Sequence, residues 1–333
     1  MSPGYQAFEG VSWRPLTAAD AEAVYLLEAA GELYADGEVE IALADVQADW
    51  SRPGFDPMTM SLGAFAGPQL IAYAQVMHGR AEALVHPEYL GRGLGTHLAR
   101  WTWEVARSEG RDRVGQTISD SERSAAALFE SLGYAPGFTA WILRISLTHP
   151  RPVPSLPEGY RFRPYRPGED DTAIYRLIDE AFDEWRNADS ESMGFENWAA
   201  STLHSVAPDW VVLITDPRGM LVGTAISLDY GPDEEGWIEQ VAVHKAHRGQ
   251  GLGGALLEES FRRFRESGRT RAGVSTDSRT GALGLYQHAG MSIARSYTRW
   301  VKTGLQSHRD RRQRGDHAGG VALGHRGQES SQG

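Results

Sequence analysis

Two series of hydrophobic patterns run along the chain, and the second series is the clearer one. Alternating apolar residues predict strands, while apolar residues spaced three and four apart predict helices. In the stretch 251–264, Leu252, Leu256, Leu257 and Phe261 share one helical face. The second series predicts strand 160–165, helices 170–183 and 195–203, a hairpin of strands 210–215 and 220–229, strand 237–243, helix 251–264, strand 272–276, helix 282–288 and strand 293–301.

The first series follows the same order less clearly. It predicts helices 17–27 and 43–50, a hairpin of strands 60–65 and 70–76, strand 83–86, helix 93–108, strand 114–118, helix 124–131 and strand 140–147. One-sided helices and hairpins of this kind pack as layers around a sheet. We therefore expect an α/β (α+β) protein of two tandem domains, each a mixed, mostly antiparallel central sheet flanked by helices.

A repeated phrase supports the duplication. Residues 85–95 read VHPEYLGRGLG, and residues 243–253, lying 158 positions later, read VHKAHRGQGLG. Further on, residues 128–134 (LFESLGY) match residues 285–291 (LYQHAGM) at a distance of 157 positions. Solenoid repeats are about 20–50 residues long, so this period indicates a duplicated domain.

Composition shifts mark the expected boundaries. Residues 148–157 contain four prolines, which forbid helix and favour an extended linker. Beyond residue 304 arginines stand among Gly, Ser and Gln with almost no apolar residues, which is typical of disorder. The expected organisation is an N-terminal domain over 1–147, a linker over 148–157, a C-terminal domain over 158–304 and a disordered Arg/Gly-rich tail over 305–333.

Charge and composition narrow the function. The chain has 333 residues, a formal net charge of −11, 41% hydrophobic residues and no cysteine. Thiolate metal sites and cysteine nucleophiles are thereby excluded, and we expect no metal. An acidic protein repels nucleic acid outside a local basic patch, for which the arginines of the tail are the one candidate. With neither a membrane-length apolar stretch nor a leader pattern, we expect a cytoplasmic protein without membrane contact.

The second glycine-rich turn carries the chemistry. Gly249, Gly251, Gly253 and Gly254 lack a Cβ, so their N–H groups can approach a ligand closely. The turn opens a helix whose first N–H groups have no internal partners and whose dipole favours negative charge. Together with Arg248 these features are typical of a pyrophosphate site. The alternative is that the glycines only form a helix entry, which the repetition of the turn disfavours.

Two ligand classes fit this turn poorly. A P-loop nucleotide site needs Gly-Lys-Ser or Gly-Lys-Thr after the glycines, and the chain lacks it. Gly249, Gly251 and Gly254 do satisfy G-x-G-x-x-G. In dinucleotide-binding folds, however, the strand runs almost directly into the first glycine, whereas residues 244–248 intervene here.

Three landmarks resemble the GNAT superfamily of N-acetyltransferases. Residues 248–253 (RGQGLG) meet its Arg/Gln-x-x-Gly-x-Gly/Ala signature, residues 238–243 (IEQVAV) resemble its fourth strand, and Leu285-Tyr286 with Gly290-Met291 resembles its Leu-Tyr-x-x-x-Gly-Phe ending. The resemblance covers residues 160–302 and, more weakly, 12–147. The tandem arrangement is similar to mycothiol synthase and related actinobacterial acetyltransferases.

The resemblance implies that acetyl-CoA is the co-substrate and assigns roles to the second half. Tyr286 matches the tyrosine that protonates the departing thiolate, and a phenol with a pKa near 10 stays protonated at neutral pH. Glu239 is our candidate base because side chains alternate along a strand, so Glu239 can face the cleft while its neighbour Ile238 faces the core. The alternatives are a salt-bridged carboxylate for Glu239 and a packed aromatic for Tyr286. The implied CoA-binding residues are Val241, Ala242, Val243, Arg248, Gly249, Gln250, Gly251, Leu252, Gly253 and Gly254.

The first half departs from this pattern. Leu90 stands at the Arg/Gln position, Phe129 answers Tyr286, and the 158-residue offset places Ala81 opposite Glu239. The second half also departs once, with Asp277 where the family often has Asn. We therefore expect catalysis in the C-terminal domain, and a scaffold or a second CoA site in the N-terminal one. The residues of that candidate second site are Val85, Gly91, Arg92, Gly93, Gly95 and Thr96.

The expected activity is acetyl transfer to a primary amine of a small, cationic molecule. Acidic residues cluster over 183–191 and 229–235, on the acceptor side in the resembled fold, and would attract a cation. A solvated acidic surface is the alternative for these clusters. Other readings are acetylation of a thiol-sugar precursor, as the mycothiol resemblance implies, and a non-catalytic acyl-CoA-binding regulator. Either a monomer or a homodimer is compatible with two fused units.

Overall fold

The computed structural model describes residues 8–149, 151, 155–183, 193–228 and 235–304. The chain divides into two compact units. Among the described residues, the first unit comprises 8–139 and 296–304, and the second unit comprises those within 140–295. The Arg/Gly-rich tail and most of the acidic segments lie outside the described residues. No helix in the described ranges has the length and apolar character needed to cross a membrane.

The first unit is a sheet in the order β1-β2-β3-β4-β5-β12. All its pairs are antiparallel except β4 with β5. Its elements are β1 Val11–Arg14, α1 Ala21–Asp36, α2 Leu43–Trp50, α3 Pro57–Met60, β2 Ser61–Ala66, β3 Gln69–Met77, β4 Arg80–Val85, α4 Leu94–Ser108, β5 Arg113–Ser119, α5 Arg123–Ser131 and the end of β12 Ser292–Thr303.

The second unit repeats this plan in the order β7-β8-β9-β10-β11-β6. Here β10 and β11 form the one parallel pair among its described strands. Its elements are the end of β6 Ala135–Ser146, β7 Arg161–Arg163, α6 Asp171–Asp183, α7 Phe195–Trp198, β8 Val211–Thr215, β9 Leu221–Leu228, β10 Gly236–Val243, α8 Leu252–Glu266, β11 Arg271–Asp277 and α9 Leu283–His288.

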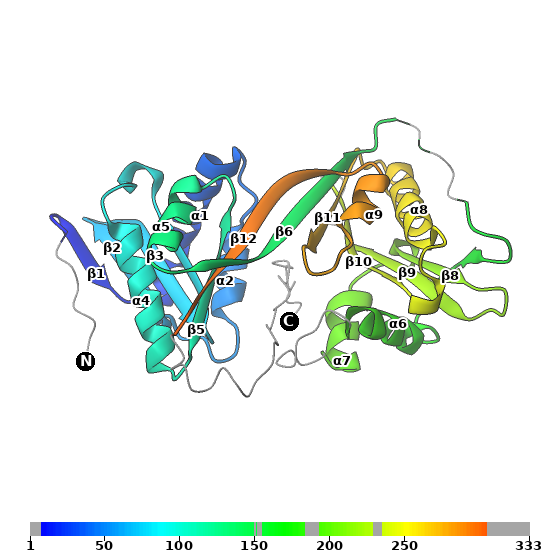
Figure 1. Ribbon diagram of the computed structural model, residues 1–333, viewed down its shortest axis with the longest axis horizontal. Helices are drawn as coiled ribbons and strands as arrows, with labels where there is room; N and C mark the ends of the chain where they lie inside the picture. Colours follow the sequence, from blue (N-terminus) through cyan, green and yellow to red (C-terminus); the bar gives the residue numbers. More distant parts are fainter. Residues whose placement is uncertain (1–7, 150, 152–154, 184–192, 229–234, 305–333) are drawn as a thin grey trace. The chain divides into compact units, whose positions relative to one another are not determined.

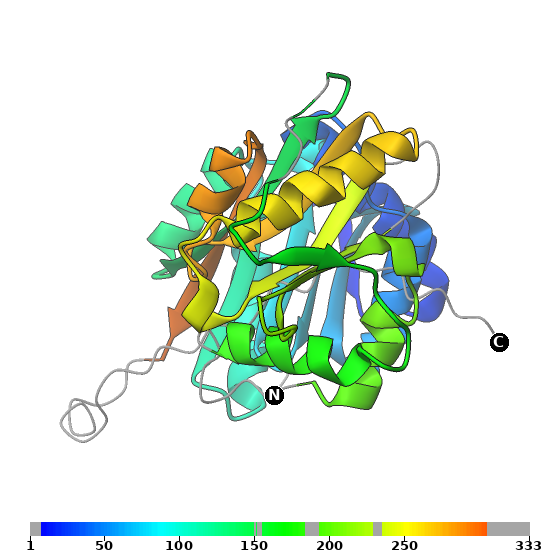
Figure 2. The same ribbon diagram turned by 90° about the vertical axis from the view of Figure 1, so that its right-hand side faces the viewer.

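Strand alternation explains the three layers of the second unit. Val211 and Leu213 of β8 lie in the core beneath α6, whereas Val212 and Ile214 lie in the core beneath α8, because successive side chains point to opposite faces. Helices α6 and α8 therefore cover opposite faces of the sheet (Figure 2). In the first unit, α1 and α2 pack on one core and α4 and α5 on the other. The expected mixed, mostly antiparallel fold is confirmed.

The two closing strands differ from the expectation that each completes its own half. Residues 140–146 of β6 pair antiparallel with β11 of the second unit. Residues 297–303 of β12 pair antiparallel with β5 of the first unit. Both long strands thus pass from one unit into the other (Figure 1). Hydrophobic alternation predicts a strand but not its partner, and the duplicated strands β5 and β11 offer equivalent edges.

Candidate active site

Strands β10 and β11 begin as neighbours and then part. Their parallel pairing runs from Gly236 with Ala272 to Ile238 with Val274, although β10 continues to Val243. Along its whole length β11 stays paired with β6 on its other side. In the described part of the chain, the edge of β10 beyond Ile238 therefore has no strand beside it, and a slot opens in the sheet.

Two backbone groups of β10 face this slot. Alternate residues of a strand direct their N–H and C=O groups to opposite neighbours. His244 donates its N–H to Val222 O (2.9 Å) on the β9 side, while Arg248 Nε donates to Val243 O (3.0 Å) on the other side. Val241, two residues before Val243, shares its direction. The slot therefore presents the N–H and C=O groups of Val241 and the N–H group of Val243 to an extended ligand, while Arg248 holds the Val243 carbonyl.

Ala242, which the family resemblance also implies as a CoA-binding residue, faces the other way. In the structure Ala242 pairs with Thr224 of β9, and its side chain is buried in the core beneath α6. The alternation that turns Val241 and Val243 toward the slot turns the Ala242 peptide away from it. Ala242 thus lies between the two slot-facing residues and presents no peptide group to the slot.

A bulge in β10 lies at the mouth of the slot. The pairing with β9 slips between Ile238, opposite Ser227, and Gln240, opposite Ile226, so Glu239 has no opposite residue. A bulge inserts one residue and re-aims its neighbours. Strand β4 of the first unit pairs with β3 without any slip over Arg80–Val85. The bulge is therefore a difference between the two units.

The bulge corrects one correspondence. The constant offset placed Ala81 opposite Glu239. In the structure Ala81 pairs with Gln116 of β5, just as Ile238 pairs with Val274 of β11. Ala81 thus corresponds to Ile238, and Glu239 is an extra residue with no counterpart in the first unit.

Glu239 is half-buried and has an indole partner. Its Oε2 accepts a hydrogen bond from Trp237 Nε1 at 3.2 Å. Burial raises the pKa of Glu239, and the Trp237 hydrogen bond partly opposes that rise. Within the described chain the carboxylate forms no ion pair, so the salt-bridged alternative does not describe it. A carboxylate with a raised pKa at a cleft is a candidate acid or base.

Tyr286 lies on α9 with its side chain 7% exposed. It shares a core cluster with Ile238, Val274 and Leu257, at the parting strands. Burial raises the pKa of Tyr286 to about 12. Its counterpart Phe129 packs in the equivalent core of the first unit. The ring of Tyr286 is therefore a packed aromatic ring, as the alternative interpretation has it. Its hydroxyl is the group that Phe129 lacks.

The glycine turn has the geometry of a cradle. Gly249 and Gly251 adopt φ of +76° and +81°, and a Cβ on either would meet nothing within 4 Å. Gly251 is the N-cap of α8, which begins at Leu252. Gly253 serves a different need, since a Cβ there would lie 3.2 Å from Leu285 of α9. The first two glycines thus leave open space at the start of α8, and the third allows helix packing.

Side chains around the turn tie it to its own unit. Tyr160, for which no motif in the sequence predicts a role, bonds through its hydroxyl to His247 Nδ1 (2.8 Å) and Gln250 Oε1 (3.1 Å). The carbonyl oxygen of the Gln250 amide is therefore engaged within its own unit. A pocket of about 430 Å³ borders the turn. Its lining residues are Leu177, Glu180, Ala181, His244, Lys245, Ala246 and Arg248.

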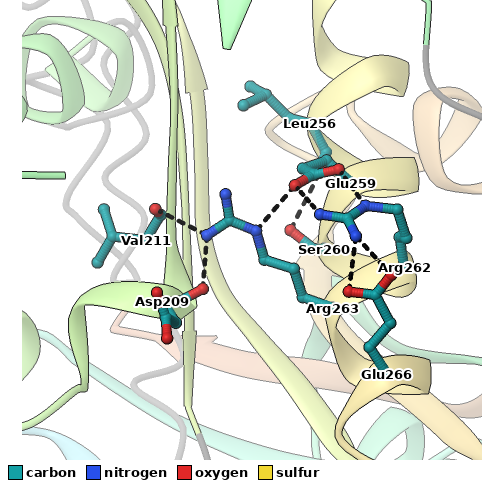
Figure 3. Close-up of polar contacts among 8 residues, drawn as sticks. All are labelled: Asp209, Val211, Leu256, Glu259, Ser260, Arg262, Arg263 and Glu266. Atoms are coloured by element: carbon teal, nitrogen blue, oxygen red, sulfur yellow. Dashed lines mark hydrogen bonds and ion pairs between the residues drawn. The ribbon is translucent and has the colours of Figure 1, made fainter. Parts of the chain in front are cut away.

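Helix α8 is anchored toward its C-terminal end by an ion cluster centred on the buried carboxylate of Glu259 (Figure 3). Glu259, 6% exposed, accepts bonds from Arg262 and Arg263. Arg263 also donates to the carbonyls of Asp209 (2.5 Å) and Val211 (3.2 Å) at the start of β8. The cluster thereby fixes the helix whose N-terminus forms the turn.

The first unit keeps the glycine turn but has Leu90 in place of Arg248. Gly91 and Gly93 adopt φ of +74° and +87°, and Gly95 lies against α5 as Gly253 lies against α9. Arg92 donates to Glu88 O at 3.0 Å and is thus held within its own loop. Thr96 lies in the first turn of α4 and Val85 ends β4.

Two acidic residues of the second unit, Asp277 and Glu235, have cationic partners. Asp277 accepts bonds from the Arg279 guanidinium at 3.1 and 2.5 Å, which neutralises the carboxylate near the slot. Glu235 is paired with Arg144 at 3.0 Å. The acidic residues at 184, 189, 191, 229, 233 and 234, and Trp185, lie outside the described residues. Trp198 is a core residue whose Nε1 donates to Gln240.

The chain is similar to known acetyltransferases in both sequence and structure. A mycothiol acetyltransferase of Salinispora tropica is 34% identical over 224 residues, covering 63% of this chain and 69% of its own. The solved structure of a GCN5-related N-acetyltransferase from Sphaerobacter thermophilus is 30% identical with a TM-score of 0.74, covering 91% of this chain and 99% of that one. A tandem GNAT protein from the clavulanic acid biosynthesis pathway shares the fold, with a TM-score of 0.65 and 17% identity over 89% of this chain and 99% of its own.

The match to a family model shows that the chain is an acyltransferase. The model of the acetyltransferase (GNAT) family matches residues 27–134 and again residues 172–291. The chain belongs to the GNAT acetyltransferase family and carries two GNAT domains in tandem. GNAT enzymes use acetyl-CoA, and the open space above Gly249 and Gly251 at the start of α8 suits its pyrophosphate. Among the described residues no group of three or more His, Asp or Glu could hold a metal ion.

Proposed function

We propose that the chain transfers the acetyl group of acetyl-CoA directly to a primary amine of a small molecule, with catalysis in the C-terminal domain. The observation that carries this proposal is the bulge in β10, which inserts Glu239 at the slot in the second unit alone. Val241 and Val243 would hold the pantetheine arm through their peptide groups. The turn over 248–254 would hold the pyrophosphate.

Glu239 acts as the base in this proposal. The amine must lose a proton as its nitrogen attacks the thioester carbonyl, and Glu239 accepts that proton directly or through water. Burial raises the pKa of Glu239, which makes its carboxylate a stronger base. The extra residue in the strand thus supplies the group that the first unit lacks.

Tyr286 acts as the acid. The C–S bond breaks as the C–N bond forms, and the Tyr286 hydroxyl donates its proton to the departing thiolate. A pKa of about 12 keeps this phenol protonated throughout the working pH range. Phe129 and Leu90 remove the acid and the turn cation from the first unit, which supports a non-catalytic role for the N-terminal domain.

The acceptor carries a primary amine, and we expect a cationic one. The acidic stretches over 183–191 and 229–235 support this choice, although Glu235 is already paired with Arg144. The mycothiol acetyltransferase relatives favour a second candidate, the amine of a thiol-sugar precursor. In either case the protein acts in the cytoplasm as a monomer or homodimer, without a nucleic-acid partner.

The test measures free CoA release from acetyl-CoA with a panel of cationic amines, peptides and a thiol-sugar precursor. We expect release with one class of amine, reduced about 10- to 100-fold by Tyr286→Phe and about 100-fold or more by Glu239→Gln. The control is Phe129→Leu, which alters the matching position of the first unit and should leave release within about twofold. Acetyl-CoA binding without release on any acceptor would instead support an acyl-CoA-binding regulator.

A further inference from the structure

Gln116 occupies the gap between parting strands in the first unit. Strands β4 and β5 are parallel neighbours at Arg80 with Gly115 and at Ala81 with Gln116, and β4 then continues to Val85 without β5 beside it. The Gln116 side chain is 3% exposed. Its Nε2 donates to Ala83 O at 3.0 Å, two residues beyond the last pair. A side-chain amide thus satisfies the carbonyl that the parting of the strands leaves without a backbone donor.

The carbonyl of Ala83 is the counterpart of the slot-facing carbonyl of Val241 in the second unit. His86 donates its N–H to Ile71 O on the β3 side, so the peptides of Ala83 and Val85 face the gap. Ala83 lies where the second unit has Val241. The first unit therefore fills, with its own amide, a hydrogen-bonding position that the second unit presents to a ligand.

The second unit differs at the residue that makes this contact. Gln116 pairs with Ala81 as Val274 pairs with Ile238. Val274 is apolar and lies in the core with Tyr286, so it cannot donate a hydrogen bond to Val241 O. The two repeats thus differ at one position that decides this contact. Gln116 fills the gap of the first unit, whereas Val274 leaves the slot of the second unit open to a ligand.

A second contact lies at the start of α4. Phe8 Cε1 lies 3.5 Å from where a Cβ on Gly93 would stand, whereas the space above Gly251 is open. The Phe8 ring is held by Trp13 and His97, with ring centroids 5.7 and 5.8 Å away. Side chains of the first unit therefore approach both the strand gap and the start of α4.

We propose that Gln116 is an internal substitute for the pantetheine amide in the N-terminal domain, so that each chain binds a single acyl-CoA, in the C-terminal domain. The inference rests on the proposed function, because that function assigns the second unit's slot to the pantetheine arm. It replaces the hypothesis of a second CoA site at Val85, Gly91 and the residues around them. Gln116 is thus a residue that determines how many acyl-CoA molecules the tandem chain accepts.

Calorimetric titration of the full chain with CoA tests the stoichiometry. We expect one CoA per wild-type chain and two per Gln116→Val chain, because the variant copies the residue of the second unit. Gln75→Val is the matched control, since Gln75 lies on β3 and bonds to Glu82 and Trp50 rather than across the gap. It should keep one CoA per chain. Two CoA per wild-type chain, or one per Gln116→Val chain, would overturn the proposal.

The reciprocal variant makes the test independent of weak binding in the first unit. Val274→Gln places the same amide beside the second unit's slot, and we expect the Kd for CoA to rise at least about tenfold while circular dichroism shows an intact fold. A tenfold rise in Kd corresponds to the loss of about one hydrogen bond between the protein and the ligand. Unchanged affinity in a folded Val274→Gln chain refutes the role of Gln116. Failure of the wild type to bind CoA at all would instead refute the proposed function.

Discussion

Trp237 Nε1 lies 3.2 Å from Glu239 Oε2 and donates a hydrogen bond to it beside the bulge in β10. This bond favours the ionised carboxylate, against the burial that raises its pKa. Trp237→Phe removes the donor, so the pKa of Glu239 should rise further. Because the base must be ionised to act, the acidic limb of the kcat/KM profile should move to higher pH.

The pH profile of Trp198→Phe provides the control for this shift. Trp198 is also buried in the second unit and donates its indole N–H to a strand residue, but its partner is the uncharged Gln240. Its loss should lower stability without moving the acidic limb. Equal shifts in the two variants would show that a general packing defect, and not the hydrogen bond to Glu239, sets the profile.

Tyr286 should contribute no alkaline limb to the profile below about pH 11. Its burial raises the pKa to about 12, so the acid stays protonated where an ordinary phenol, with a pKa near 10, would begin to ionise. We expect kcat to stay level from about pH 8 to 10.5 when the acceptor amine is saturating and neutral. A fall in kcat centred near pH 10 that disappears in Tyr286→Phe would show that the hydroxyl is less buried than the structure places it.

Gly251 and Gly93 form a matched pair for deciding which domain holds acetyl-CoA. Both are helix N-caps at positive φ, +81° and +87°, where an alanine costs about 1–2 kcal/mol of backbone strain. Gly251→Ala should raise the KM for acetyl-CoA about tenfold, whereas Gly93→Ala should cost similar stability and leave that KM unchanged. A KM raised equally by Gly93→Ala would place acetyl-CoA in both domains.

The turn could be predicted from the sequence because each glycine meets a local requirement. Gly249 and Gly251 need positive φ, and Gly253 needs room for Leu285, so the residue type itself records the geometry. The fold class followed in the same way, because alternation and helical spacing are local patterns with a direct structural meaning. These are the features for which neighbouring residues carry the physical cause.

The exchanged strands and the role of Gln116 depend on distant partners. β6 and β12 pair with β11 and β5, and neither choice leaves a local mark in the strand itself. The bulge did leave a trace, since the repeat offset is 157 residues at Ala81 with Ile238 and 158 at Val85 with Val243. A glutamine in a strand is ordinary, and only the parting of β4 from β5 gives Gln116 its contact.

Glu259 should stabilise the second unit in a way that depends on pH. Burial alone would raise its pKa, but hydrogen bonds and charges from Arg262 and Arg263 outweigh burial and lower it. A carboxylate with a depressed pKa contributes stability above its unfolded pKa, near 4.5, and loses that contribution as the pH falls through its folded pKa. Glu259→Gln should therefore cost about 2 kcal/mol at pH 7, and the difference from wild type should shrink by pH 3.

Urea denaturation at pH 7 and pH 3 measures this difference, with Glu266→Gln as the control. Glu266 accepts bonds from the same Arg262, but its side chain is 59% exposed, so its replacement should cost no more than about 0.5 kcal/mol. The contrast isolates burial as the cause, because helix, partner and substitution are shared. Equal losses in the two variants, or a Glu259→Gln deficit as large at pH 3 as at pH 7, would contradict the assignment of the α8 anchor to the Glu259 charge.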